Sequence, residues 1–439
     1  MKRFGLFCFS NDLRLHDQPG LLQASQEVDA LICVYVMDPR IVNANQYGLV
    51  GLSDHRQRFL KQSLMVLDQQ LGRLNHSLVV LEGKLEYELA EIIDQYKISS
   101  VYRSKQAGWI ENQTWLSLQT KYQQVRFIER DSHTLFDEAQ LPFLLDELPV
   151  TFSKFKNIVA DLLPTQAVPA VTELPPMIQL NKPFSGWLLN DVEPFNGGEV
   201  LGLQQCQAYF SDQLPLNYKY VRNALDGWQN SSKFSPWLAN GCLSVRALYT
   251  RLLNFERTVK ANESTYWLYF ELLWREYFQW YAHRHGARLF AFKGIKGRAP
   301  LTSYYANRFQ QWVNGTTPYP IVNSGMNELA ATGYISNRVR QIVASCLVNE
   351  LSLDWRYGAA YFEQQLIDYD VASNWGNWQY LAGVGADVKD KRHFNLEKQT
   401  QMFDPNRDYI TRWKGDENLI PTDTVDAADW PISPGYDIQ

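Results

Sequence analysis

The first 130 residues alternate short runs of β-branched and aromatic residues with segments of helical periodicity. Five runs have the length and composition of buried strands, at residues 4–9, 31–36, 78–81, 99–102 and 125–128. The segments between them are long enough for the crossover connections that join parallel strands. Residues 1–130 are therefore predicted to form an α/β domain on a five-stranded parallel sheet. No GxGxxG motif follows the first run, so the usual dinucleotide cradle is absent there.

Three further segments follow. Residues 131–199 contain eight prolines, which do not sustain long helices or central strands, so this segment is predicted to be an interdomain connector. Helical periodicity dominates residues 200–414, which are predicted to form an all-α domain. Residues 415–439 carry six acidic and no basic side chains and are predicted to be an exposed acidic tail.

The net charge of −5 argues against a nucleic-acid binder, but the charge is unevenly distributed. Residues 200–414 carry 24 basic and 17 acidic side chains, whereas residues 1–199 carry 18 basic and 24 acidic ones. Twelve of the 14 tryptophans also lie beyond residue 186. A basic, tryptophan-rich domain is typical of proteins that contact phosphates and bases, although ordinary scatter of surface charge explains the balance equally well.

The five cysteines are widely spaced and include no CxxC pair, so reduced core thiols are expected and no metal site is predicted. No run approaches the ~18 apolar residues that a membrane span requires. The apolar run near the N-terminus is too short for a signal peptide. The protein is therefore expected to be cytoplasmic, without a membrane partner.

Hydroxyl residues and one lysine cluster at 231–235, where a helix is predicted to begin. Ser235 is the candidate N-cap, with Pro236 at the first helical position. Free amides, hydroxyls and an ammonium group at a helix start can together hold a pyrophosphate. Helix capping alone is the simpler explanation of Ser235 and Pro236.

Glu271 is predicted to lie on a helix whose apolar residues surround nearly its whole circumference. A carboxylate among Trp267, Trp274 and Phe278 is costly to bury unless it is paired or has a function. An ion pair with Arg275, one turn later, is the competing structural explanation.

The segment 368–380 combines two aspartates with two tryptophans three residues apart, bracketed by asparagine and glycine. This composition is suited to lining a planar aromatic ligand with amide groups at its edge. Arg340 lies upstream in a helical pattern. Its guanidinium could pair with a carboxylate of this segment, or it could face an anionic or electron-rich cofactor.

These motifs resemble the photolyase and cryptochrome family of flavoproteins, and within it the cryptochrome-DASH branch. Five strings lie in the family's order: SKFSPWLA at 232–239, GCLS at 241–244, ELLWREYF at 271–278, NRVRQ at 337–341 and DYDVASNWGNWQY at 368–380. The resemblance covers most of the chain. It implies an N-terminal α/β domain, a long connector and a helical domain that binds FAD.

The resemblance implies that FAD binds in a folded form, with its phosphates near residues 218 and 231–235. Asn374 would face flavin N5, where an amide accepts from a reduced N5–H or donates to an oxidised N5. A carboxylate at that place would disfavour an anionic reduced flavin. The residues implied to bind FAD are Tyr218, Ser231, Ser232, Lys233, Phe234, Ser235, Arg275, Arg340, Asp368, Asp370 and Asn374.

In similar enzymes the substrate is a cyclobutane pyrimidine dimer, flipped out of the strand into a cavity beside the flavin. The residues that match the lining of this cavity are Glu271, Trp274, Asn337, Gln341 and Tyr380. Glu271, Trp274, Asn337 and Asn374 are the implied catalytic residues. Gln341 and Tyr380 replace the Met and Trp of other photolyases, which makes the pocket more polar and less aromatic. Such a pocket would hold a dimer less firmly, so UV-damaged single-stranded DNA, which has no base pairs to break, is the expected partner. RNA and duplex DNA are further candidate partners.

Flavin photoreduction in the family runs through three tryptophans. Trp378 and Trp355 match the proximal and middle members, whereas the place of the distal one falls on Thr302. Tyr304 and Tyr305 are therefore the candidate relays. Tyrosine oxidation requires proton loss, so slower or less efficient transfer to the surface is expected.

The resemblance also implies an antenna, 5,10-methenyltetrahydrofolate, held between the domains by an acidic residue. Glu111 or Asn112 could serve. The function implied is light-driven repair of pyrimidine dimers by a monomeric lyase. A blue-light receptor that signals or binds nucleic acid without repair is the alternative, and a flavin oxidoreductase active in darkness is a third class.

Overall fold

A computed structural model describes residues 2–49, 51–180, 186–187, 194–386 and 392–423. Its sheet has the strand order β3-β2-β1-β4-β5, and every neighbouring pair is parallel. The strands are β1 (Phe4–Phe9), β2 (Ala30–Met37), β3 (Leu78–Glu82), β4 (Ser100–Ser104) and β5 (Arg126–Arg130). The predicted five-stranded parallel sheet is confirmed.

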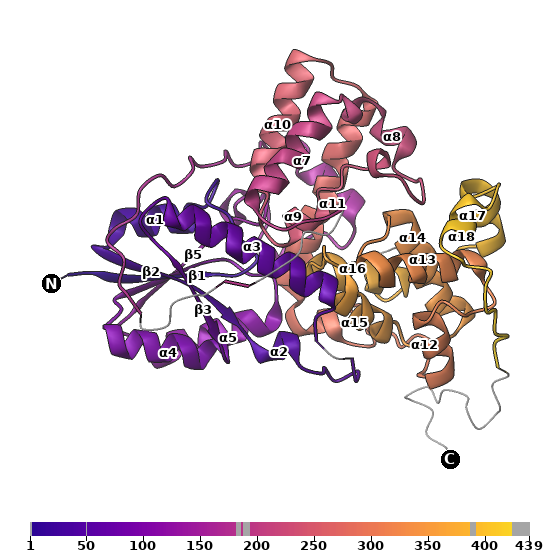
Figure 1. The fold of residues 1–439 in the computed structure, drawn as a ribbon, viewed down its shortest axis with the longest axis horizontal. Coiled ribbons are helices and arrows are strands. Elements are labelled where there is room, and N and C mark those ends of the chain that lie inside the picture. The colour runs from indigo at the N-terminus through magenta and orange to yellow at the C-terminus, as the bar shows by residue number, and fades with distance from the viewer. Residues whose placement is uncertain (1, 50, 181–185, 188–193, 387–391, 424–439) are drawn as a thin grey trace.

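Helices cover both faces of the sheet, with α1 and α3 on one face and α4 and α5 on the other (Figure 1). These helices, with the short α2, are α1 (Pro19–Glu27), α2 (Pro39–Val42), α3 (Asp54–Gly72), α4 (Leu85–Tyr96) and α5 (Trp109–Lys121). Side chains alternate between the faces of each strand. Leu6 and Cys8 belong to a core under α4 and α5, whereas Phe7 and Phe9 belong to a core that continues into the helical domain.

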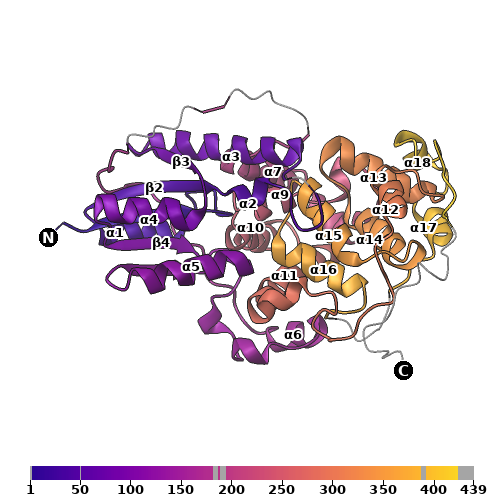
Figure 2. The same ribbon diagram turned by 90° about the horizontal axis from the view of Figure 1, so that it is seen from below.

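In the described part of the connector the elements are short, as its prolines predict. They are η1 (Glu138–Gln140), η2 (Leu145–Glu147) and α6 (Phe152–Ile158). Figure 2 shows α6 beside the longest helix, α11 (Glu263–His285). Side chains of α11 are hydrogen-bonded to connector backbone, so the connector is packed on the helical domain along part of its course.

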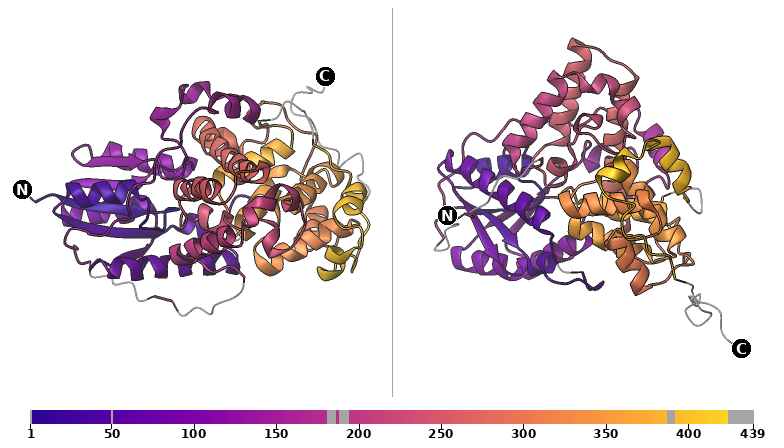
Figure 3. Two further views of the ribbon diagram at one scale, coloured as in Figure 1. Left: turned by 90° about the horizontal axis from the view of Figure 1, so that it is seen from above. Right: turned by 45° about the vertical axis from the view of Figure 1, so that its right-hand side comes forward.

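The helical domain occupies the other half of the molecule (Figure 3). Besides α11 it contains α7 (Glu199–Ser211), η3 (Leu214–Asn217), α8 (Tyr218–Val221), η4 (Trp228–Asn230), α9 (Ser235–Ala239), α10 (Val245–Thr258), η5 (Gly286–Phe290), α12 (Ala306–Val313), α13 (Pro320–Thr332), α14 (Asn337–Ser345), the π-helical η6 (Cys346–Glu350), α15 (Trp355–Gln365), α16 (Val371–Leu381), α17 (Leu396–Phe403) and α18 (Asp408–Arg412). Within the described part of residues 200–414 no strand is found, which confirms the predicted all-α class. The domain boundaries at residues 130, 199 and 414 stay predictions, and most of the acidic tail lies outside the described residues.

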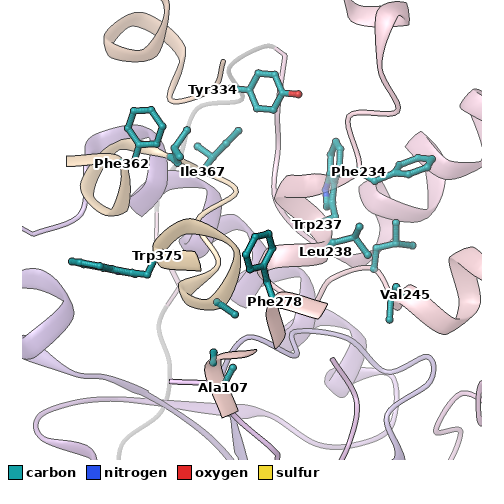
Figure 4. Packing of buried hydrophobic residues seen from close by; sticks show 14 of the residues in the cluster. Ala107, Phe234, Trp237, Leu238, Val245, Phe278, Tyr334, Phe362, Ile367 and Trp375 are labelled. Carbon is teal, nitrogen blue, oxygen red and sulfur yellow. The ribbon is translucent and has the colours of Figure 1, made fainter. Parts of the chain in front are cut away.

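A buried arginine joins the two domains at the loop after β1. Arg14 is 1% exposed, and it donates hydrogen bonds to the carbonyl oxygens of Gly241, Asp17 and Ser132. These acceptors belong to the helical domain, the loop itself and the connector. Figure 4 shows the apolar packing that continues into the helical domain, with Trp237 of α9 and Phe278 of α11 in one cluster. The junction therefore holds the helical domain in a fixed position against the sheet.

Two expectations from the sequence concern the cysteines and membrane spans. All five cysteines are buried and free, as expected of reduced core thiols. Among the described residues, no helix combines the length and the apolar character needed to cross a bilayer.

Candidate active site

A cavity of about 540 Å³ lies within the helical domain. Volumes of this size are typical of sites for cofactors and drug-sized ligands. The predicted site residues that line it are Tyr218, Ser232, Phe234, Ser235, Glu271, Trp274, Arg275, Asn337, Arg340, Gln341, Asp368, Asp370, Asn374, Trp378 and Tyr380. The predicted residues outside its lining are Ser231, Lys233, Trp355, Tyr304, Tyr305 and Glu111.

Glu271 lies on α11 and forms an ion pair with Arg222, which follows α8. The predicted alternative, an ion pair with Arg275, is wrong, because the Arg275 guanidinium donates instead to the backbone oxygen of His133. Burial raises the pKa of Glu271, and the Arg222 charge partly opposes that shift. The Arg222 guanidinium also lies 4.1 Å from the centroid of the Trp267 ring. One wall of the cavity therefore carries the Arg222 cation, held by two contacts, beside a carboxylate whose pKa is raised.

The start of α9 differs from the prediction by one residue. Ser235 is the first residue of the helix, Phe234 takes the cap position, and Pro236 is therefore the second helical residue. A proline fits there because the first N–H groups of a helix have no partner within it. The predicted N-cap role of Ser235 is thus wrong, but its side chain still lines the cavity.

Two residues of the 231–235 cluster lie behind the cavity wall. Lys233 has a left-handed backbone with φ +57°, and its Nζ lies 4.7 Å from the centroid of the Tyr334 ring. The Ser231 hydroxyl oxygen is buried and has no hydrogen-bond partner among the described residues. A buried polar atom without a partner is rare in folded proteins.

Arg340 of α14 and Asp368 form a buried ion pair at the cavity. One guanidinium nitrogen donates to both carboxylate oxygens, at 3.0 and 2.8 Å. Burial disfavours the guanidinium charge, but Asp368 more than offsets this effect, and the pKa of Arg340 is raised. The predicted Arg340–Asp368 pairing is therefore present. Asp370 has a different role in the fold, since its Oδ1 accepts from the Ser373 N–H at 2.7 Å and caps α16.

Asn374 projects from α16 with its amide oriented by the backbone. Its Nδ2 donates to the Ala359 carbonyl oxygen at 3.0 Å, and the side chain is 8% exposed. Its Oδ1 receives no hydrogen bond from the described residues, so an acceptor is left for whatever fills the cavity. The amide thus keeps its oxygen as an acceptor and one N–H of Nδ2 as a donor, so both options stay open.

Aromatic rings surround the part of the cavity nearest Glu271. The Tyr380 ring stands edge-on to the Trp274 ring at 5.9 Å between centroids, with an interplanar angle of 74°. Trp267, Phe270 and Tyr369 also line the cavity. Sequence reasoning missed these three and Arg222, because aromatic residues at helical spacing usually belong to an ordinary core.

The predicted electron-transfer residues differ in burial. Trp378 lines the cavity, and Trp355 is fully buried. Tyr304 is 45% exposed and stacks on Tyr357, at 4.2 Å and 20°. Tyr305 lies instead under the Arg308 guanidinium, 4.7 Å from its ring centroid. Of the two candidate relays, Tyr304 has the more exposed ring.

The antenna candidates are also distinguished. Both ends of the Asn112 amide are occupied, because Arg103 donates to its Oδ1 at 2.9 Å and its Nδ2 donates to the Gln106 carbonyl oxygen at 2.8 Å. The Glu111 side chain is exposed, and its charge acts on Glu363 in the helical domain. The pKa of Glu363, on α15, is raised mainly by burial, and the negative charge of Glu111 raises it further. Glu111 is therefore the better candidate of the two.

The cavity meets the requirements of a dinucleotide with a flat ring system. It offers hydroxyl groups at Ser232 and Ser235, a fixed cation at Arg340 and an amide acceptor at Asn374. Aromatic and apolar side chains form the rest of the lining. These groups could hold the phosphates and the ring edge of FAD.

Comparisons with known proteins agree with this chemistry. Residues 6–175 match the family described as DNA photolyase, and residues 267–433 match the FAD binding domain of DNA photolyase. The chain is 50% identical to cryptochrome DASH of Idiomarina loihiensis over 434 residues, which cover 98% of this chain and 97% of that protein. It is 49% identical to cryptochrome DASH of Vibrio parahaemolyticus over 436 residues, which cover 98% of each chain.

Solved structures show the same fold. The crystal structure of a Synechocystis cryptochrome matches with a TM-score of 0.89 and 36% identity, over 94% of this chain and 88% of that one. A bacterial class III photolyase from Agrobacterium tumefaciens matches with a TM-score of 0.80 and 25% identity, over 94% and 86% of the two chains. The helical domain is thus an FAD-binding domain, and the chain belongs to the photolyase and cryptochrome family, in its cryptochrome-DASH branch.

Proposed function

We propose that this protein is a photolyase of the DASH type, which uses light to repair cyclobutane pyrimidine dimers in single-stranded DNA. One observation carries the proposal. The residues suited to a flavin ring, Arg340 and Asn374, line the same cavity as Glu271 and Trp274, which are suited to two fused pyrimidine bases of one strand. Electron transfer over a short distance requires such a shared space.

When bound, FAD would supply the photochemistry, which is the transfer of one electron to the dimer and its return after the cyclobutane ring has opened. The protein holds the substrate in place. Trp274 offers an aromatic surface for stacking, and the Asn337 amide can hydrogen-bond to a base edge. The Glu271 carboxylate accepts from a base N–H when charged, and it can donate to a carbonyl once protonated.

The residues proposed to lie beside the flavin ring would stabilise its reduced form. The Asn374 Oδ1 offers an acceptor to an N–H at the ring edge, which favours the reduced form. The Arg340 charge stabilises an anionic ring, and Asp368 holds that guanidinium in place. Together they favour the electron-rich cofactor that repair requires.

Gln341 and Tyr380 support the single-stranded substrate. Both line the cavity, where they provide a polar group and a smaller aromatic surface than Met and Trp would. Stacking on a smaller aromatic surface offsets less of the free energy that base flipping costs. A single strand spares the protein the cost of breaking base pairs, so we expect it to be the preferred substrate.

We propose Glu111 as the residue that holds a folate antenna, 5,10-methenyltetrahydrofolate. Its carboxylate is exposed and lies within electrostatic range of Glu363 of the helical domain, in contrast to the occupied amide of Asn112. The absorption spectrum of the purified protein tests this assignment. A near-ultraviolet band beyond those of the flavin is expected, and Glu111→Gln should lose it.

Repair is tested with one oligonucleotide that contains a single dimer, presented as a single strand and as a duplex. Under blue light with a reductant, the single strand should be repaired faster, and neither form should be repaired in the dark. Binding without repair in the light would support a receptor instead. Turnover of NAD(P)H in the dark would support an oxidoreductase.

A further inference from the structure

The connector is bound along α11 by hydrogen bonds at several levels. The Glu276 carboxylate accepts from the Leu135 N–H at 2.6 Å, and the Tyr277 hydroxyl donates to the Val150 carbonyl oxygen at 2.8 Å. Two turns further on, the Arg284 guanidinium donates to the Leu148 carbonyl oxygen. The connector therefore has a fixed position beside α11 where it reaches α6.

The first residue of α6 places its ring directly on a substrate-facing tryptophan. The Phe152 and Trp274 rings stack with centroids 3.7 Å apart and an interplanar angle of 13°. Phe152 also meets Phe270 edge-on, at 5.1 Å and 86°. It is 4% exposed, so its ring is held on all sides.

Phe152 lies on the side of the indole that is turned away from the cavity. Trp274 is half-buried and lines the cavity, whereas Phe152 is buried and does not line it. A parallel ring in van der Waals contact resists rotation of the indole, because a rotated ring would clash with it. The indole therefore presents its other side to the cavity in one orientation.

We infer that Phe152 is a positioning residue, which holds the Trp274 ring in the orientation that stacks on a flipped base. The connector then supports the Trp274 side of the substrate site from behind, in addition to linking the domains. This inference rests on the proposed function, because it assigns the base-stacking surface to Trp274.

Binding of a single-stranded oligonucleotide that contains one dimer tests the role. The flavin-loaded protein should bind it more tightly than the same strand without the dimer. Phe152→Leu keeps an apolar side chain but removes the planar ring, and it should reduce this preference about tenfold, within the range that stacking on one base contributes. Phe152→Tyr keeps the ring and should restore the preference.

Phe155→Leu is the matched control. Phe155 lies on the same helix and is fully buried, but it packs against Tyr277 and Phe143 and has no ring contact with Trp274. Phe155→Leu should lower the free energy of unfolding about as much as Phe152→Leu does, and it should leave the preference for the dimer unchanged. An equal loss in both variants would overturn the inference, since it would show an effect of stability alone.

A second measurement examines the ring contact without substrate. In protein labelled with 5-fluorotryptophan, the ¹⁹F resonance of Trp274 can be assigned by its loss in Trp274→Phe. Phe152→Leu should shift and broaden this resonance, and Phe155→Leu should not. A shifted resonance with unchanged dimer preference would overturn the positioning role. A wild-type protein that shows no preference for the dimer would instead overturn the proposed function, before any variant is compared.

Discussion

Asp368 accepts two hydrogen bonds from one guanidinium nitrogen of Arg340, at 3.0 and 2.8 Å, and its side chain is 3% exposed. This pair places a fixed cation in the wall of the cavity. Breaking a buried pair by removing one partner leaves an uncompensated charge, which is far more destabilising than losing an exposed pair. The first prediction follows from this difference.

Asp368→Asn should lower the free energy of unfolding by about 2 kcal/mol, because Arg340, whose side chain is 24% exposed, keeps its charge without a carboxylate partner. Asp29→Asn is the control. The Asp29 side chain is 41% exposed and pairs with an Arg3 that is 60% exposed, so its loss should change the free energy by less than about 1 kcal/mol. Urea unfolding of both variants measures the difference, and equal effects would contradict the structural role of the Arg340 pair.

Glu328 of α13 predicts a dependence of stability on pH. Burial raises its pKa to about 8, and the Tyr409 hydroxyl donates to its Oε2 at 2.5 Å. A carboxyl group whose pKa is raised by folding stabilises the protein fully below its unfolded pKa. That stabilisation is lost as the pH rises through the folded pKa.

Between pH 5.5 and 8.5 the wild type should therefore lose stability, relative to Glu328→Gln, by on the order of 3 kcal/mol. Urea unfolding at the two pH values, in the same buffer and salt, makes the comparison. Parallel changes in the two proteins would show that Glu328 does not titrate in this range.

Asn374→Asp should lower the reduction potential of the bound flavin. A carboxylate beside the ring repels the negative charge of the reduced form. We expect a shift of at least about 30 mV, which corresponds to a tenfold change in the equilibrium of a two-electron couple. Potentiometric titration measures it. A potential equal to the wild type's would place Asn374 away from the redox-active part of the ring.

Tyr304→Phe should slow flavin photoreduction severalfold, because it removes the exposed hydroxyl that could release a proton. Tyr305→Phe should have a smaller effect, since the Tyr305 ring lies under Arg308, whose charge disfavours a cationic radical there. Transient absorption follows the radicals. A long-lived radical on an exposed tryptophan would contradict this relay, as would unchanged photoreduction in the double variant.

Local patterns in the sequence were sufficient to predict the sheet and the helical domain, because strand and helix periodicity depend on neighbouring residues. Local patterns did not identify contacts between residues that are far apart in the sequence. The i, i+4 pattern favoured Arg275 as the partner of Glu271, whereas folding brings Arg222 there from 49 positions away. The start of α9 was misplaced by one residue because proline fits either of the first two helical positions.

The most distant contribution to the site had no sequence signal. Phe152 lies in a proline-containing connector, where no periodicity indicates which side chains pack inward. Its contact with Trp274 depends on how residues 133–150 are bound along α11, a tertiary arrangement with no local pattern. Resemblance to a known family identified the cavity residues from their motifs but not this residue.

Repair is tested most directly by a mass balance of the substrate. The purified protein is illuminated with blue light in the presence of a reductant and a single-stranded oligonucleotide that carries one thymine dimer, and the products are separated chromatographically. We predict that the dimer disappears in the light and not in the dark, with two thymines restored for each dimer lost and no oxidation of the reductant beyond the amount that reduces the flavin once. A flavin-loaded protein that binds the strand and leaves the dimer intact under illumination would contradict the proposed function.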